Sequence, residues 1–247
     1  MKPIIYSNER VDQLVSKGVQ IIQSPEVFSF SLDAVLLAHF AKVPKKGVIV
    51  DLCAGNGAVG LFISQKTNGK IIGVELQERL ADMAKRSIQL NDLEEQMDML
   101  AIDLKETTRY IPKDSVDLVV CNPPYFKELP TNTKNPNPHL AIARHELHTN
   151  LEEVIAMSAG LLKMNGKFSM VHRPERLVEI LQLMDKHLLT PKRLQFIYPK
   201  KHKEANVLLI EGIRNGKSGG LKILPPLYVY NEDNQYLPEV AEMLYGK

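Results

Sequence analysis

The sequence predicts an α/β fold built on a doubly wound, mostly parallel sheet of seven strands. Short apolar runs alternate with helical patterns along most of the chain, as in β-α units. The last two predicted strands are joined by too few residues for a parallel crossover, so they should form an antiparallel pair. We therefore expect an N-terminal extension at 1–45 that packs on a main domain at 46–230, followed by a C-terminal tail at 231–247.

The individual elements follow from the pattern of apolar residues. The seven strands are expected at 47–53, 70–76, 97–102, 116–121, 167–171, 193–198 and 205–213. Helices are expected at 58–65, from 76 to an end marked by Asn91, and at 150–163 and 174–187, with Asp82 and Arg86 on the exposed side of the second. In the extension, 20–23 is a candidate strand and 32–41 a helix capped by Ser31. Residues 215–220 read as a turn and 221–230 as a strand or an extended tail.

Composition limits the class of protein. A hydrophobic content of 44% in 247 residues is enough for one substantial core. No apolar run approaches the roughly 18 residues of a membrane span, and the start lacks a signal sequence, so a cytoplasmic protein is expected. The two cysteines, Cys53 and Cys121, form neither a disulfide framework nor a zinc motif, and no metal site is predicted. A net charge of +2 permits a polyanionic partner without requiring one.

Glycines and acids lie at the carboxyl ends of the first three strands. Residues 55–60 match the pattern G-x-G-x-x-G, in which Gly55 and Gly57 would let the backbone approach a ligand. Asp51 precedes this turn and would repel a pyrophosphate, so it favours a ligand with a cationic part, such as S-adenosylmethionine. Glu75 is placed to accept hydrogen bonds from the ribose hydroxyls of such a ligand, and Asp103 is placed to accept one from its adenine amine. Each acid could instead cap a helix or begin a turn.

The fourth strand leads into Asn122-Pro123-Pro124-Tyr125. The side-chain oxygen of Asn122 and the carbonyl of Pro123 are candidate acceptors for the hydrogens of an amine conjugated to a ring or carbonyl. Two prolines remove competing backbone donors, and Tyr125 offers a ring on which a planar group can stack. The alternative is an ordinary turn that ends a strand.

These motifs all follow strand ends, which meet at one edge of a parallel sheet. Together they resemble the motif set of class I S-adenosylmethionine-dependent methyltransferases with a Rossmann-like fold, in the small-domain (MTS-like) group. The motifs are 51–57, Glu75, Asp103 and 122–125. The likeness is strongest to bacterial tRNA adenine-N6 methyltransferases and extends to 28–37, 143–146 and the basic segment near Lys200. The resemblance makes 46–230 the methyltransferase domain.

The resemblance also assigns roles to residues. It implies that Asn122, Pro123, Pro124 and Tyr125 are catalytic, and that S-adenosylmethionine contacts Asp33, Asp51, Gly55, Gly57, Glu75, Leu76, Asp103 and Asn122. An RNA substrate, with tRNA favoured, would be held by Phe126, Arg144, Lys200, Lys201 and Lys203. A solvated charged turn is an equally ordinary interpretation of the lysines.

Three enzymatic functions remain open from the sequence, beside that of an RNA-binding module that holds the cofactor but catalyses no reaction. The first is methylation of an exocyclic base amine in RNA, with adenine-N6 of a tRNA favoured. The second is methylation of a release-factor glutamine at N5 or of an rRNA guanine at N2, which need the same pocket. The third, supported only by the glycine pattern, is a nicotinamide-binding oxidoreductase. The sequence does not indicate an oligomeric state.

Overall fold

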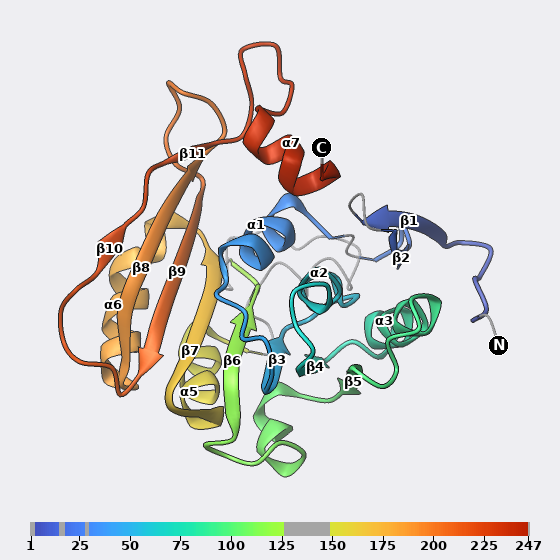
Figure 1. Ribbon diagram of the computed structural model, residues 1–247, viewed down its shortest axis with the longest axis horizontal. Helices are drawn as coiled ribbons and strands as arrows, with labels where there is room; N and C mark the ends of the chain where they lie inside the picture. Colours follow the sequence, from blue (N-terminus) through green and yellow to red (C-terminus); the bar gives the residue numbers. More distant parts are fainter. Residues whose placement is uncertain (1–2, 15–17, 28–29, 126–148, 247) are drawn as a thin grey trace, which may run out of the picture.

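The computed structural model describes residues 3–14, 18–27, 30–125 and 149–246. Figure 1 shows one main sheet with helices around it and a separate N-terminal hairpin. The strands are β1 Arg10–Leu14, β2 Val19–Gln23, β3 Val48–Leu52, β4 Lys70–Glu75, β5 Met97–Ala101, β6 Val116–Cys121, β7 Leu162–His172, β8 Leu189–Tyr198, β9 Val207–Arg214, β10 Lys222–Ile223 and β11 Leu227–Tyr228. The α-helices are α1 Leu32–Phe40, α2 Ala58–Ser64, α3 Glu78–Leu90, α5 Leu151–Leu161, α6 Leu177–Lys186 and α7 Pro238–Tyr245, and the 3-10 helices are η1 Leu104–Arg109 and η2 Pro174–Arg176.

The main sheet has the strand order β10-β8-β9-β7-β6-β3-β4-β5, with β11 also paired to β8. Only β9 runs against its neighbours, so the predicted antiparallel pair of β8 and β9 is confirmed. The chain moves one way from β3 to β5 and returns to the other side of β3 with β6. Leu52 and Cys121 are paired across β3 and β6, which is the topological switch point where open sheets bind ligands.

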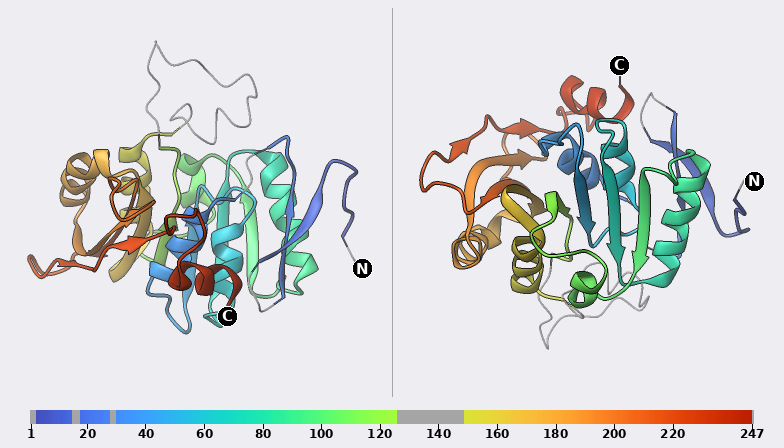
Figure 2. Two further views of the ribbon diagram at one scale, coloured as in Figure 1. Left: turned by 90° about the horizontal axis from the view of Figure 1, so that it is seen from above. Right: turned by 60° about the horizontal axis from the view of Figure 1, so that its bottom comes forward.

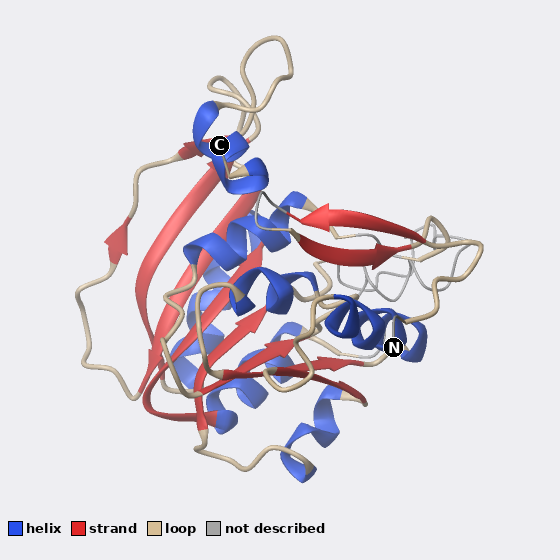
Figure 3. Ribbon diagram, turned by 45° about the vertical axis from the view of Figure 1, so that its right-hand side comes forward, coloured by secondary structure: helices blue, strands red, loops and turns tan. Residues whose placement is uncertain are grey.

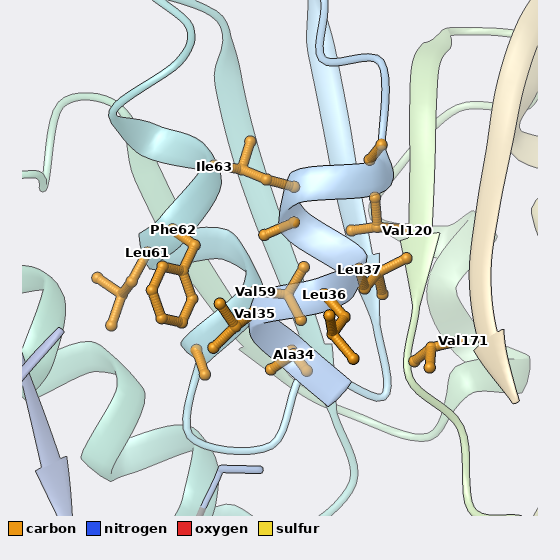
Figure 4. Packing of buried hydrophobic residues seen from close by; sticks show 14 of the residues in the cluster. Ala34, Val35, Leu36, Leu37, Val59, Leu61, Phe62, Ile63, Val120 and Val171 are labelled. Atoms are coloured by element: carbon orange, nitrogen blue, oxygen red, sulfur yellow. The ribbon is translucent and has the colours of Figure 1, made fainter. Parts of the chain in front are cut away.

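The central strands bury alternate residues in two different cores because successive side chains point to opposite faces. Ile49 and Val120 pack with α1, α2 and α3, whereas Val50 and Val119 pack with α5, α6 and η1. Figure 3 shows helices on both faces of the sheet. In Figure 4, Leu37 of α1 lies toward Val120 of β6 within the first of these cores.

The N-terminal extension is more ordered than its sequence predicts. The strand at 20–23 is confirmed as β2, but it pairs with β1, which the sequence analysis did not anticipate. This hairpin lies beside α3, at the far end of the molecule from β8 (Figure 2). The backbone N–H of Ile22 donates to the Ser87 hydroxyl at 2.9 Å. The hairpin is therefore held against α3.

Three local predictions are corrected. Ser31 occupies the position before α1, but its side chain makes no capping hydrogen bond. Arg86 is buried rather than exposed, because its guanidinium pairs with Glu9 of the extension at 2.6 Å as well as with Asp82. The helix around it also begins later than expected, at Glu78.

The C-terminal part contains regular structure as well. The segment 221–230 forms β10 and β11, which extend the sheet beyond β8. Helix α7 packs on α1 through residues that include the buried Val240, where the sequence had suggested a tail. The boundaries drawn at 45 and 230 remain a prediction. Within the described ranges, no helix combines the length and the apolar character needed to cross a membrane.

Candidate active site

A cavity of about 450 Å³ opens at the carboxyl ends of β3, β4, β5 and β6. Among its lining are nine of the predicted site residues: Asp33, Gly55, Glu75, Leu76, Asp103, Asn122, Pro123, Pro124 and Tyr125. This volume lies within the range typical of small-molecule sites. Residues from distant parts of the sequence thus converge on one space, as expected for strand ends of a parallel sheet.

Glu75 fixes one side of this cavity. Its Oε2 accepts a hydrogen bond from the backbone N–H of Gly55 at 2.8 Å, and its Oε1 accepts one from Gln77 at 2.8 Å. Burial raises the pKa of Glu75, and the backbone hydrogen bonds oppose that shift. A carboxylate has about four lone-pair positions, so acceptor capacity remains for the hydroxyls of a ribose. Glu75 is held in place by the glycine turn that it faces.

The Asn122 turn follows β6 and lines the same cavity as Glu75. The Tyr125 hydroxyl is 2.7 Å from the side-chain oxygen of Asn122 and 2.7 Å from Oδ2 of Asp33. Burial raises the pKa of Tyr125 well above its usual range, and the negative charge of Asp33 adds to the shift. The hydroxyl therefore keeps its proton and links two predicted site residues.

Residues at the end of β7 and just after it support the Tyr125 ring. The Arg173 guanidinium lies 5.1 Å from the ring centroid, and the His172 ring lies 5.2 Å from it at a tilt of 54°. Arg176 donates to the backbone carbonyl of Tyr125 at 3.4 Å. Arg173 also lines the cavity, and the sequence analysis missed it. Its position just after the strand at 167–171, at the same sheet edge as the other motifs, is the signal that could have identified it.

Comparison with known proteins identifies the family. A family model for the methyltransferase small domain matches residues 18–192. The chain belongs to the methyltransferase small-domain family.

Two curated relatives are named tRNA1(Val) (adenine(37)-N6)-methyltransferase. The one from Photobacterium profundum is 27% identical over 73% of this chain and 75% of its own. The one from Porphyromonas gingivalis strain W83 is 26% identical over 79% and 78%. The matches span most of both chains, at modest identity.

Solved structures share the fold. A protein described as a predicted O-methyltransferase from Agrobacterium tumefaciens has a TM-score of 0.67 at 22% identity, covering 85% of this chain and 94% of its own. Geranyl diphosphate C-methyltransferase from Streptomyces coelicolor, solved with S-adenosyl-L-homocysteine, has a TM-score of 0.56 at 13% identity over 74% of each chain. The predictions of a Rossmann-like α/β fold and of an S-adenosylmethionine-dependent methyltransferase are confirmed.

Two predicted cofactor residues of the methyltransferase do not line the cavity. The carboxylate of Asp51, expected to face the ligand, instead accepts from the backbone N–H of Gly60 in α2 at 3.1 Å and is fully buried. Burial raises the pKa of Asp51 to about 8, and the nearby charge of Glu75 acts in the same direction. Gly57 has φ +83° at the start of α2, and a Cβ there would lie 3.1 Å from that of Ala84. Asp51 and Gly57 therefore contribute to the structure of the glycine turn without lining the cavity.

Asp103 combines the two interpretations that its sequence position allowed. It lines the cavity, and its Oδ1 accepts from the backbone N–H of Lys105 at 2.8 Å as the cap of η1. The cap uses one of the carboxylate's roughly four lone-pair positions, so acceptor capacity remains for the predicted adenine contact.

The predicted substrate residues lie away from the cavity or outside the described chain. Lys200, Lys201 and Lys203 belong to the turn after β8, at the carboxyl edge but not in the cavity lining. Lys200 donates to the backbone carbonyl of Glu232 at 2.9 Å, whereas Lys201 and Lys203 are exposed. Phe126 and Arg144 lie outside the described residues.

Proposed function

We propose that this methyltransferase transfers a methyl group from S-adenosylmethionine to the exocyclic N6 amine of an adenine in tRNA. The observation that carries the proposal is the convergence of Asn122 and its Pro-Pro turn with Glu75 on one cavity. An amide oxygen beside a turn without backbone donors suits a conjugated amine. The names of the curated relatives support adenine in tRNA over the other amines.

The residues of the cavity fit the methyl donor. Glu75 has acceptor capacity for the ribose hydroxyls, and Asp103 for the adenine amine. Leu76, Leu80 and Ile102 offer apolar surface for the adenine ring. The bound donor supplies an electrophilic methyl group on a positively charged sulfur.

The chain's own contribution to the reaction is orientation and exclusion of water. Asn122 Oδ1 and the Pro123 carbonyl accept the two hydrogens of the target amine and direct its lone pair along the line of attack. The new N–C bond forms as the C–S bond breaks, and the C–S electron pair passes to sulfur. The methylated nitrogen then releases one proton through the same acceptors to water. No strong base is required, since the nitrogen becomes acidic as the bond forms.

A base inside a helix cannot reach this cavity, so the target must be unpaired or turned outward. Unstacking costs a few kcal/mol, which favours a loop nucleotide. The lysine turn at 200–203 is on the same sheet edge and is proposed to hold the RNA backbone.

The direct test is to incubate the enzyme and a labelled methyl donor with separate pools of tRNA, rRNA and protein, and then to digest the labelled product. We expect label in tRNA as N6-methyladenosine. Label found as N2-methylguanosine from rRNA, or as N5-methylglutamine from protein, would show that the proposed substrate is wrong, whereas the assignment of the amine pocket would stand.

A further inference from the structure

The Tyr125 hydroxyl stands between two groups that both accept hydrogen bonds. It lies 2.7 Å from Asp33 Oδ2 and 2.7 Å from Asn122 Oδ1. A phenol has one hydrogen to donate, and neither a carboxylate nor an amide oxygen can return one. Only one of these two contacts can be a hydrogen bond at any moment.

Asp33 is the stronger competitor for that hydrogen. Hydrogen bonds to an ionised acceptor are roughly twice as strong as those between neutral groups. With the hydrogen given to Asp33, the phenol oxygen faces Asn122 only as an acceptor. A rotation of the Asn122 amide by 180° restores the pairing, because it brings the Nδ2 hydrogens to the phenol oxygen.

We propose that Asp33 is a positioning residue that, through the Tyr125 hydroxyl, turns the Asn122 amide so that its oxygen is free for the target amine. The inference rests on the proposed function, in which Asn122 Oδ1 accepts from that amine. An amide turned the other way would present its own N–H groups to the amine, which is a donor facing a donor.

Asp33 and the middle link of these contacts, Tyr125, both pack against other parts of the protein. Asp33 lies in the first turn of α1, whose residues Leu36, Leu37 and Ala38 are buried in the core. Tyr125 is flanked by His172 and Arg173. A site on packed elements keeps its geometry better than one on a free loop, so the charge on Asp33 can set the orientation of Asn122.

The alternative is the role that the sequence suggests for Asp33, a direct contact with the cofactor. The two roles differ in what they change. A cofactor contact affects the affinity for S-adenosylmethionine or S-adenosylhomocysteine. A positioning role affects the rate of the bound complex, and it depends on the Tyr125 hydroxyl.

The kinetic test is a double-mutant cycle with Asp33→Asn, Tyr125→Phe and the double variant, assayed on tRNA. We expect each single variant to lower kcat by about tenfold and to leave the dissociation constant of S-adenosylhomocysteine within about twofold of the wild type. The double variant should lose no more kcat than either single variant, because both substitutions break the same chain of contacts. Asp185→Asn and Tyr110→Phe, which change exposed residues away from the cavity lining, serve as controls. Multiplying losses, or weakened cofactor binding at unchanged kcat, would overturn the proposal.

A second test needs no RNA. In protein labelled with ¹⁵N-asparagine, the Asn122 side-chain amide is assigned through Asn122→Ala, and its nuclear Overhauser effects to the Tyr125 ring are measured. We expect a clear effect in the wild type and a weaker one in Asp33→Asn. Its absence from the wild type would contradict the inference. If it is present while no tRNA accepts a methyl group, the proposed substrate fails and the positioning role stands.

Discussion

At the scale of single residues, the cavity depends on acids that are buried rather than solvated. Asp51 and Glu75 are both buried, and burial raises the pKa of each. Asp51 bonds only the N–H of Gly60 in the described structure, with its Oδ1 lacking a partner. A buried carboxylate with one backbone bond is costly when charged, so it makes stability depend on pH.

Asp51→Asn should remove part of that dependence. The folded protein binds a proton on Asp51 up to about pH 8, whereas the unfolded chain releases it near the ordinary value of 3.8. Stability from Asp51 is therefore complete below the unfolded pKa and is lost as the pH rises through about 8, with a slope of at most about 1.4 kcal/mol per pH unit. We expect the variant, which can still accept from Gly60, to gain unfolding free energy relative to the wild type between about pH 5 and 8.

Urea unfolding across this pH range measures the effect, with the exposed Glu78→Gln as a control for general charge effects. If the unfolding free energy of the wild type and of Asp51→Asn changed with pH in the same way, the raised pKa of Asp51 would be contradicted.

Glu75→Gln should weaken the binding of the cofactor. The substitution replaces one carboxylate oxygen, already bonded to the backbone, by a donor that faces Gly55 or Gln77 N–H. We expect the dissociation constant of S-adenosylhomocysteine to rise by about tenfold or more, as measured by isothermal titration. Glu78→Gln, three residues along and exposed, should bind as the wild type does. Equal affinities for all three proteins would remove Glu75 from the site.

The sequence locates these residues at one sheet edge but does not show where their side chains point. Strand ends place Asp51 and Glu75 together, yet one faces Gly60 behind the turn and the other faces the cavity. The link from Tyr125 to Asp33 joins residues 92 positions apart, so no local pattern predicts it.

At the scale of elements, long apolar strands are predictable and short polar ones are not. The strands from β3 to β9 follow from their apolar runs, since both faces of the sheet are buried. Strand β1 has mostly exposed residues and is recognised only through its pairing with β2. Helix α7 is held by tertiary contacts with α1, which a local pattern does not report.

Arg86→Ala should loosen the N-terminal hairpin. The side chains of Arg86 and Glu9 are 9% and 2% exposed, and Arg86 also donates to the backbone carbonyl of Ile4 at 2.8 Å. Removing one partner of a buried pair leaves the other charge uncompensated, at a cost of about 3 kcal/mol. We expect this loss in urea unfolding, together with faster hydrogen exchange in β1 and β2.

The matched control is Arg10→Ala, which breaks the exposed pair with Asp12. It should cost less than about 1 kcal/mol. A similar cost for both variants would mean that the Arg86 pair does not anchor the hairpin.

At the scale of the whole molecule, the cavity and the lysine turn share one edge of the sheet, because β8 runs parallel to β7 and β6. An RNA that enters the cavity can therefore extend over Lys200, Lys201 and Lys203. Changing all three to alanine should weaken tRNA binding and lower the steepness of its salt dependence, by about 0.7 to 0.9 for each phosphate that the protein no longer neutralises.

Lys45, Lys46 and Lys113 are exposed at the opposite edge, before β3 and β6, and their triple alanine variant is the control. Binding measured over a series of salt concentrations separates the two. If tRNA binding by the two triple variants depended on salt concentration with the same slope, the RNA backbone would not lie over the lysine turn.

The most direct test of the whole account compares Asn122→Ala with the wild type in two assays, cofactor binding and methyl transfer to tRNA. Asn122 is predicted to hold the amine that reacts, so we expect transfer to fall by about a hundredfold or more while S-adenosylhomocysteine binds within a few-fold of the wild type. Asn68→Ala, at an exposed position, should match the wild type in both assays. Transfer by Asn122→Ala at the rate of the wild type would contradict the amine pocket on which the proposed function depends.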